Sequence, residues 1–225
     1  MIIKSLIPAR SGSKRIKDKN IKLLNDIPLL RYSIIESLHV PEIMETYVST
    51  DEYGSLARDW GAKVIKRPKR LCGDEVGDWP VINHALKFMA PVDLIVYLRP
   101  TTPFRSSETI SRAIKTLIDA KDKATGLRSV HEMSESAYKC CEVEYGFVKP
   151  ICKLSLATLD KVNQIMTTTY HPNGYVDICK PDLIKAGHLW GPDIIAFQTI
   201  KVPELDTEDD WLFAEWWGQR VKVYG

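Results

Sequence analysis

The sequence predicts an α/β fold with a mostly parallel sheet and flanking helices, and two observations lead to it. First, short apolar runs alternate with stretches of helical spacing from the N-terminus to about residue 98. This alternation is typical of parallel strands joined by right-handed crossovers. Second, a length of 225 residues fits one domain that buries its own core. We therefore expect a single domain over residues 1–225 that carries one insertion.

The first half of the chain supplies most of the predicted sheet. In the helix expected at 27–38, Leu30 and Ile34 recur at helical spacing, and Pro28 stands where a helix can begin. The run at 94–98 is the most apolar in the chain and predicts a central strand. Further strands are expected at 2–8, 44–49 and 63–65, and further helices at 53–60, 79–89 and 108–120, the last capped by Ser106 or Ser107.

A different pattern begins near residue 130. Weak alternation on either side of Gly146 predicts a hairpin-like insertion over residues 130–169. Such an insertion can make subunit contacts, and a surface flap is the alternative. The sequence from His171 to Gly174 is a turn signal. Beyond it we expect a strand at 175–179, a short helix from Pro181, a strand at 194–202 and a helix at 211–221.

Composition excludes several classes of protein. Hydrophobic content of 44% and charged content of 27% are ordinary for a globular chain, and no apolar run is long enough to cross a bilayer. No signal peptide is recognisable, so we expect a cytoplasmic protein without membrane partners. Five cysteines without a C-x-x-C pair predict reduced thiols. The net charge of +2 gives no case for nucleic-acid binding.

The stretch after the first predicted strand is the strongest candidate site. Residues 9–20 combine small residues with cations, and small residues let backbone N–H groups approach a ligand closely. Because clustered cations repel one another unless an anion or solvent relieves them, the loop is either a polyphosphate cradle or a solvated basic turn. Its place directly after a buried strand favours the cradle. The cations are Arg10, Lys14, Arg15, Lys17 and Lys19.

Three further segments carry charge beyond predicted strands. A basic segment at 66–70 and two arginines, Arg99 and Arg105, follow strands, and open α/β folds bind ligands at the carboxyl ends of strands. Glu204 and Asp206 alternate on an extended segment, which puts two carboxylates on one side, as a hard cation requires. The acidic residues after them are explained by a helix N-terminus.

Taken in order, these segments resemble the acylneuraminate cytidylyltransferase family over nearly the whole chain. The most specific part, which is similar to the family's nucleotide-binding signature, is Ile7-Pro8-Ala9-Arg10-Ser11-Gly12-Ser13-Lys14-Arg15-Ile16 followed by Lys19-Asn20. Supporting matches are Ser49-Thr50-Asp51, Arg67-Pro68 with Leu71 and Asp74, Pro100-Thr101-Thr102-Pro103-Phe104-Arg105, Pro172-Asn173-Gly174, and Leu205-Asp206-Thr207 with Asp210-Trp211.

The resemblance implies a Rossmann-like, GT-A-like nucleotidyltransferase fold that binds a nucleoside triphosphate and Mg²⁺. In such enzymes a sugar hydroxyl attacks the α-phosphate and pyrophosphate leaves. A triphosphate needs cations and backbone donors to spread its charge, which the basic loop supplies. The resemblance also implies a homodimer, with the insertion at the subunit contact.

The same resemblance assigns roles to individual residues. It implies that the nucleotide is bound by Ala9, Arg10, Ser11, Gly12, Ser13, Lys14, Lys19, Asn20, Arg67 and Asp78. Of these, Arg10, Lys14 and Lys19 are expected to take part in catalysis. The sugar substrate is expected to contact Arg99, Thr101, Thr102, Gln164, His171, Asn173 and Asp177, and the metal Glu204 and Asp206.

The metal and base positions depart from the family pattern. Glu204 stands where an aspartate is usual, and its longer side chain can move the metal or admit a water. Asp78 stands where a small hydroxyl residue is common. A carboxylate there can accept from the cytosine amino group or from the N1 and N2 donors of guanine. CTP is the expected donor by resemblance, with GTP as the alternative.

The acceptor pocket departs most. Arg99 stands where glutamine is usual, Asn163-Gln164 where an arginine-glutamine pair is usual, and Asp177 where a tyrosine is expected. We expect an acidic sugar, a nonulosonic acid such as sialic acid or a relative, with a sugar phosphate or phosphonate as the alternative. An alternative of another class is a nucleotide-binding subunit without catalysis.

Overall fold

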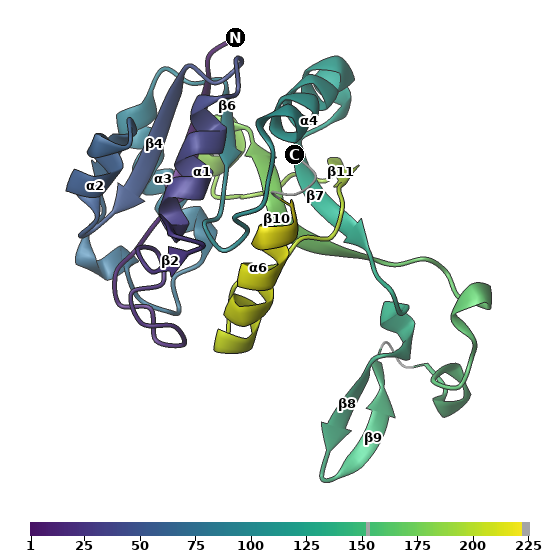
Figure 1. Cartoon of the computed structure of the whole chain (residues 1–225). Coiled ribbons are helices and arrows are strands. Elements are labelled where there is room, and N and C mark those ends of the chain that lie inside the picture. Colours follow the sequence, from purple (N-terminus) through teal and green to yellow (C-terminus); the bar gives the residue numbers. More distant parts are fainter. Residues whose placement is uncertain (152–153, 222–225) are drawn as a thin grey trace.

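A seven-stranded sheet forms the centre of the molecule (Figure 1). The computed structural model describes residues 1–151 and 154–221. The strands of the sheet lie in the spatial order β11-β7-β10-β6-β1-β4-β5. Their bounds are β1 Ile3–Pro8, β4 Glu45–Thr50, β5 Lys63–Lys66, β6 Leu94–Tyr97, β7 Gly126–Glu132, β10 Tyr170–Cys179 and β11 Ile194–Gln198.

Most strand pairs in this sheet are parallel. β4 and β6 both pair with β1 in parallel, β5 pairs in parallel with β4, and β11 with β7. β10 is the exception, because it runs antiparallel to both of its neighbours, β6 and β7. The carboxyl ends of β1, β4 and β6 meet at one edge, where the loops that follow them gather. The predicted α/β fold with a mostly parallel sheet is confirmed.

Helices cover both faces of the sheet. One face packs against α1 and α4 in a cluster that contains Ile34, Val96 and Ile114, and the other packs against α3 through Ile82 and Tyr97. This cover on both sides explains why β6 is apolar along its whole length. The described helices are α1 Leu29–Leu38, α2 Gly54–Asp59, α3 Asp78–Met89, α4 Ser107–Ala120, α5 Pro181–Lys185 and α6 Glu208–Val221.

Two parts of the sheet differ from the prediction. No strand is predicted at β7, because Arg128 and His131 interrupt its apolar pattern. β10 begins at Tyr170, five residues before the predicted strand, so the turn signal falls inside it. The strand takes up these turn-forming residues as an irregularity in its pairing with β7, and Gly174 there adopts a left-handed φ of +63°. A small hairpin that was not predicted, β2 Leu23–Leu24 with β3 Ile27–Pro28, precedes α1.

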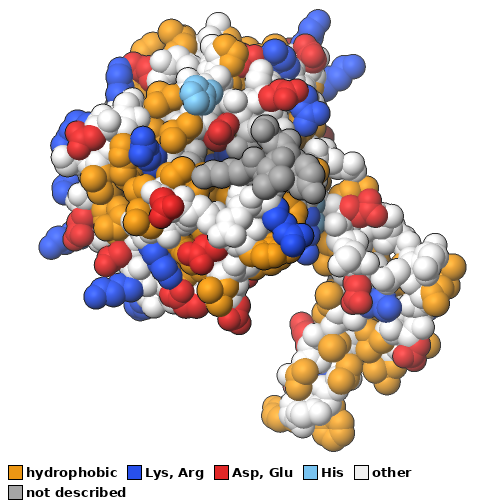
Figure 2. All heavy atoms as spheres, viewed as in Figure 1, with side chains coloured by type: hydrophobic (Ala, Val, Ile, Leu, Met, Phe, Trp, Pro, Cys, Tyr) orange, Lys and Arg blue, Asp and Glu red, His pale blue; other side chains and the backbone are white. Residues whose placement is uncertain are grey.

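The predicted insertion projects from the body as an arm (Figure 1). It carries the hairpin of β8 Cys141–Glu144 and β9 Phe147–Pro150, with Gly146 in the turn at a φ of +82°, as predicted. Apolar side chains on this hairpin are open to solvent, with Tyr145 92% and Phe147 73% exposed. Figure 2 shows hydrophobic side chains gathered along the arm. Its role at a subunit contact stays a prediction.

The sequence composition predicted reduced thiols and no membrane-spanning segment. Cys72, Cys140, Cys141 and Cys179 are free thiols in the described part of the chain, and Cys152 lies outside it. No helix within residues 1–151 and 154–221 is both long and apolar enough to cross a membrane.

Candidate active site

The basic loop lies at the carboxyl end of β1 and is anchored by a carboxylate. Ser11 donates from its backbone N–H and its hydroxyl to the two carboxylate oxygens of Asp51, at 2.8 and 2.6 Å. Although burial opposes its charge, these hydrogen bonds lower the pKa of Asp51. Gly12 adopts a left-handed φ of +69° with open space beside it. The backbone N–H groups of Gly12, Ser13 and Lys14 have no acceptor among the described residues, so they are available to a ligand.

Two cations of this loop share one carboxylate. Nη2 of Arg10 lies 2.5 Å from Oδ1 of Asp74, and Nζ of Lys14 lies 2.8 Å from Oδ2. The hydrogen bond from Lys14 and the charge of Arg10 lower the pKa of Asp74. Asp74 therefore occupies the position in which an anionic ligand of the loop would be held.

Removing this carboxylate is expected to strengthen nucleotide binding. In the wild type the phosphates of CTP have to displace Asp74 from the loop cations, and in Asp74→Asn they do not. CTP should therefore bind the variant about threefold more tightly than the wild type, which is the size of the effect of an exposed ion pair. Titration calorimetry at low salt measures this. The adjacent exposed acid gives the matched control, and Glu75→Gln should leave the affinity unchanged. Weaker binding in Asp74→Asn would contradict the competition between Asp74 and the phosphates.

Lys19 connects the loop to the far end of the sequence. Its Nζ donates to the carbonyl oxygen of Leu205 at 2.8 Å and lies 3.2 Å from Oδ1 of Asp206. Arg15 approaches the same oxygen at 3.6 Å. The side chain of Asn20 closes the loop, because its Nδ2 donates to the carbonyl oxygen of Arg10 at 2.9 Å. The loop and the segment at 203–207 therefore form one site.

Arg67 supports the site from inside the protein. Its side chain is buried and donates to Oγ and to the carbonyl oxygen of Ser49, at 3.1 and 2.7 Å. Desolvation lowers the pKa of Arg67. Ser49 is the residue whose carbonyl oxygen also accepts from the N–H of Ala9 at 2.9 Å. Arg67 therefore fixes the end of β4 against the start of the basic loop.

A chain of ion pairs crosses the sheet edge beside α3. Nη1 of Arg99 donates to Oδ2 of Asp177 at 2.5 Å, and Nη2 donates to Oδ2 of Asp78 at 2.6 Å. Tyr97 donates to the second carboxylate oxygen of Asp78 at 2.7 Å. Although burial opposes its charge, Asp177 and then Asp78 raise the pKa of Arg99. Asp177 is 1% exposed, and Nε of Arg128 lies 3.9 Å from its other oxygen.

This network contains two residues whose predicted contacts with the substrates stay predictions. Asp78 was expected to contact the base and Arg99 the acceptor, but in this structure they bind each other. Arg99 is a bridge between two carboxylates, so its charge is already compensated.

Several predicted substrate residues hold the loops of the site in place. Oγ1 of Thr102 donates to the carbonyl oxygen of Asn173 at 3.3 Å, and Nδ2 of Asn173 donates to Thr199 at 2.7 Å. The carbonyl oxygen of Thr101 accepts from the N–H of Leu205 at 2.8 Å. Arg105 is buried and donates to backbone carbonyl oxygens, and burial lowers its pKa to about 9. These contacts position the segments, and the side-chain oxygen of Asn173 also accepts from the N–H of Tyr175 at 3.2 Å.

The predicted metal ligands stand at the boundary between the loop and a pocket. Asp206 faces the loop through Lys19, whereas Glu204 lines the pocket. Desolvation and the negative charge of Asp206 raise the pKa of Glu204. Among the described residues no group of three or more histidine, cysteine or acidic side chains is placed to hold a metal. Two carboxylates completed by phosphate oxygens are a donor set that Mg²⁺ accepts.

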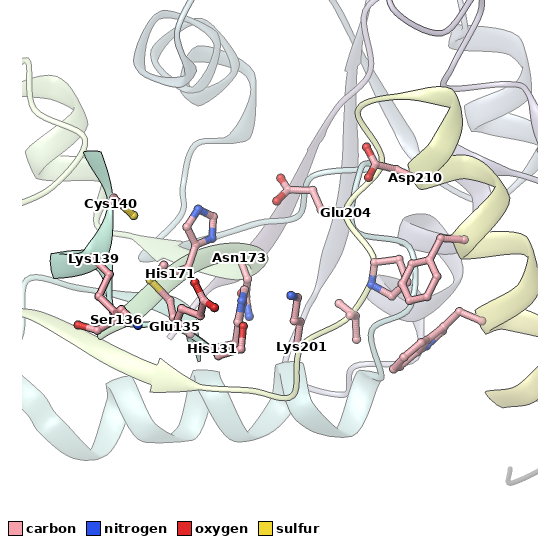
Figure 3. A pocket seen from close by; sticks show the side chains of 16 residues that line it. His131, Glu135, Ser136, Lys139, Cys140, His171, Asn173, Lys201, Glu204 and Asp210 are labelled. Atoms are coloured by element: carbon pink, nitrogen blue, oxygen red, sulfur yellow. The ribbon is translucent and has the colours of Figure 1, made fainter. Parts of the chain in front are cut away.

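The pocket has a volume of about 820 Å³ and lies between the body, the base of the arm and α6 (Figure 3). Its polar lining includes Glu204, His171 and Asn173 from the predicted site, together with His131 and Lys201, which the sequence analysis missed. His131 and His171 face each other across the antiparallel pair of β7 and β10. The sequence analysis missed His131 because no strand was predicted there, so nothing placed it opposite His171.

One predicted residue lies apart from this site. Gln164 is exposed in a short helical turn, Asn163–Ile165, on the arm, and does not line the pocket of its own chain. The structure thus brings together the basic loop, Glu204, Asp206, His171 and Asn173, and leaves Gln164 outside.

Comparison with known proteins identifies the family of the chain. The sequence model of a family described as cytidylyltransferase matches residues 5–151. The N-acylneuraminate cytidylyltransferase of Escherichia coli is 33% identical over 91% of this chain and 49% of its own length. The CMP-N,N'-diacetyllegionaminic acid synthase of Legionella pneumophila is 35% identical over 51% of this chain and 53% of its own.

A solved structure extends the likeness to the fold. CMP:2-keto-3-deoxy-manno-octonic acid synthetase complexed with CTP superposes with a TM-score of 0.71, at 16% identity, over 98% of this chain and 99% of that one. The chain spans about half the length of the curated relatives it matches. The family match covers more than half of the chain, in the region that carries the basic loop. The chain therefore belongs to the cytidylyltransferase family, and the resemblance to the acylneuraminate cytidylyltransferases is confirmed.

Proposed function

We propose that this protein transfers CMP from CTP to an acidic sugar, a nonulosonic acid such as sialic acid or a relative, and releases pyrophosphate with the help of Mg²⁺. The relatives whose names state an activity are synthases and transferases of CMP-linked acidic sugars, which supports this class of acceptor.

One observation carries the proposal. Asp206 contacts Lys19 of the basic loop, and Glu204, two residues earlier, lines the pocket. A triphosphate on the loop and a sugar in the pocket would therefore meet at the two carboxylates. This is where a metal shared by the two substrates has to lie.

The residues of the chain divide the work of the reaction. The amides of Gly12, Ser13 and Lys14, with the Arg10 guanidinium, are placed to bind the phosphates once Asp74 is displaced. Lys19 stands beside Asp206, where it can neutralise charge that develops on the leaving pyrophosphate. When bound, Mg²⁺ would polarise the phosphate oxygens and lower the pKa of a coordinated hydroxyl.

The reaction itself is a single displacement. The acceptor oxygen forms a bond to the α-phosphorus, the bond from that phosphorus to the bridging oxygen breaks, and the proton of the acceptor hydroxyl leaves with solvent. No histidine general base has to be invoked, because the charge is handled by cations and the metal.

A screen of acceptors tests the proposal. Pyrophosphate release is measured with CTP or GTP, Mg²⁺, and a panel of nonulosonic acids, sugar phosphates and sugar phosphonates. We expect release with CTP and one or more nonulosonic acids. Release only with GTP or with phosphorylated acceptors would move the donor or the acceptor to the alternatives. Nucleotide binding by calorimetry without any release would favour a binding subunit without catalysis.

We also propose that the arm mediates a homodimer. Tyr145 and Phe147 leave large apolar surfaces open at its end, which is the pattern of an interface rather than of a free surface. The double change Tyr145→Ser, Phe147→Ser is expected to convert a dimer into a monomer in sedimentation velocity. The exposed pair Leu212→Ser, Phe213→Ser on α6 serves as a control that should stay dimeric. A monomeric wild-type protein at all concentrations would remove this proposal.

A further inference from the structure

The pocket contains a second group of basic side chains, separate from those of the basic loop. His131 lies at the end of β7 and His171 at the start of β10, and the antiparallel register sets them directly opposite each other. Their ring centroids are 5.6 Å apart. The chain after β11 continues beside β7, because the N–H of Thr199 donates to the carbonyl oxygen of Val130 at 2.9 Å. This pairing brings Lys201 to the same wall of the pocket (Figure 3).

These three side chains lack a counter-ion. Within the described residues no carboxylate forms an ion pair with His131, His171 or Lys201, whereas four of the five cations of the basic loop are paired. Nδ1 of His131 is buried and has no hydrogen-bond partner in the same part of the chain. Desolvation and then the charges of Lys201 and His171 lower the pKa of His131. An anion placed between these basic groups would oppose this shift, because an opposite charge favours the protonated form of His131.

Glu135 lines the pocket with its carboxylate unpaired among the described residues, and the other two acids of the lining have different roles. Asp210 also lines the pocket, but one of its carboxylate oxygens accepts from the N–H groups of Asp206 and Thr207 and from the Thr207 hydroxyl, at 3.1, 2.8 and 2.7 Å. These bonds fix the start of α6. Glu204 stands with Asp206 at the boundary to the loop. A lysine within the group also disfavours a metal and favours an oxyanion.

The other cations near the acceptor side are occupied. Both prongs of Arg99 are bound by Asp177 and Asp78, and the buried Arg105 donates to backbone carbonyl oxygens. Neither can receive a carboxylate without breaking these contacts. His131, His171 and Lys201 therefore remain open on the wall that β7 and β10 form, and Lys139 lines the pocket from the base of the arm.

We propose that His131, His171 and Lys201 form the site that binds the carboxylate of the acceptor sugar. The inference rests on the proposed function and deepens it, because it names the side chains that would hold the carboxylate of the acceptor. The geometry of a 2-keto acid sugar fits this assignment. Its carboxylate and its reacting hydroxyl are attached to the same carbon, so the anion site has to adjoin the metal pair. Glu204, one of that pair, lines the same pocket as the three basic side chains.

The test compares an acid with its ester. N-acetylneuraminate and its methyl ester are titrated by calorimetry into protein that holds CTP without divalent cations, so that no turnover occurs. The wild type should prefer the acid by about tenfold or more, the scale of a hydrogen bond between charged partners. In Lys201→Met the preference should fall to within about twofold, with the affinity for CTP unchanged. A preference that survives in Lys201→Met overturns the proposal, as does a wild type that binds both probes equally or binds neither.

A control variant separates this wall of the pocket from the arm. Lys139 lines the same pocket from the base of the arm, and Lys139→Met should keep the preference for the acid. Loss in Lys139→Met together with retention in Lys201→Met would place the carboxylate on the arm and overturn the assignment. Imidazole ¹⁵N spectra give a second readout. N-acetylneuraminate should shift the signals of His131 and His171 and leave the exposed His39 and His188 unchanged.

The anion site and the reaction can fail separately. If the preference depends on Lys201 but no acceptor releases pyrophosphate from CTP, the anion site stands and the proposed reaction is wrong. If pyrophosphate is released with N-acetylneuraminate but Lys201→Met keeps the preference, the reaction stands and the anion site is wrong.

Discussion

Asp206→Asn is expected to lower kcat for pyrophosphate release by about three orders of magnitude, while CTP binding without metal changes little. The carboxylate is the contact between the pocket segment and Lys19, at 3.2 Å, and it is one of the two proposed metal ligands. Asparagine keeps the size of the side chain but removes the charge that a metal requires. A metal contributes several kcal/mol to stabilising the transition state of such a transfer, and each 1.36 kcal/mol is a factor of about ten in rate.

The controls for Asp206→Asn separate chemistry from stability. Asp209→Asn removes an exposed carboxylate from the first turn of α6, three residues away, and should keep nearly full turnover. The free energy of unfolding of Asp206→Asn should lie within about 1 kcal/mol of the wild type, because its ion pairs are partly exposed. Raising Mg²⁺ should restore part of the lost rate. Full turnover in Asp206→Asn at saturating substrates would remove the metal assignment and, with it, the meeting point of the two substrates.

The parts of the fold that were predictable are those whose signal is local. β1, β4, β5 and β6 are short apolar strands separated by stretches of helical spacing, and their parallel pairing follows from the helices that connect them. The hairpin around Gly146 was likewise predictable from a turn residue between alternating runs. In these segments local preference and tertiary structure agree.

β7 and the start of β10 could not be predicted because their pairing is non-local. His171 lies in a stretch of turn-forming residues, and only the antiparallel neighbour, 40 positions away at His131, makes it a strand. The group of His131, His171 and Lys201 is a consequence of that pairing. No spacing in the sequence predicts this group, because its members come from β7, β10 and the segment after β11.

The residues of the basic loop and of the carboxylate pair could be predicted from the sequence, but the ion pairs that they form could not. Arg10 and Lys14 stand in a recognisable motif, whereas their ion pairs with Asp74 depend on the loop before α3 folding back over β1. The same holds for Arg99. Its charge suggested an anion receptor, and the structure compensates that charge with Asp78 and Asp177, which come from α3 and β10.

Asp177→Asn is expected to lower the free energy of unfolding by about 3 kcal/mol. The side chain is 1% exposed and receives a hydrogen bond of 2.5 Å from Arg99. Removing one partner of a buried ion pair typically costs 3–5 kcal/mol, because the other charge is left without compensation. Arg99 keeps Asp78, so the effect should fall at the lower end. Urea denaturation measures it, and the slope with denaturant should not change if the folded state is intact.

Two further variants decide whether the effect comes from the pair. Asp182→Asn removes a carboxylate that is 95% exposed in the nearby α5, and should change stability by less than about 0.5 kcal/mol. The double change Arg99→Gln, Asp177→Asn removes both charges, so it should be less destabilising than the sum of the single changes. Strict additivity would mean that Asp177 does not depend on Arg99. A double change that costs less than the sum would mean that Asp177 stabilises the fold through its ion pair with Arg99. The carboxylate of the acceptor would then be bound by other basic side chains of the pocket.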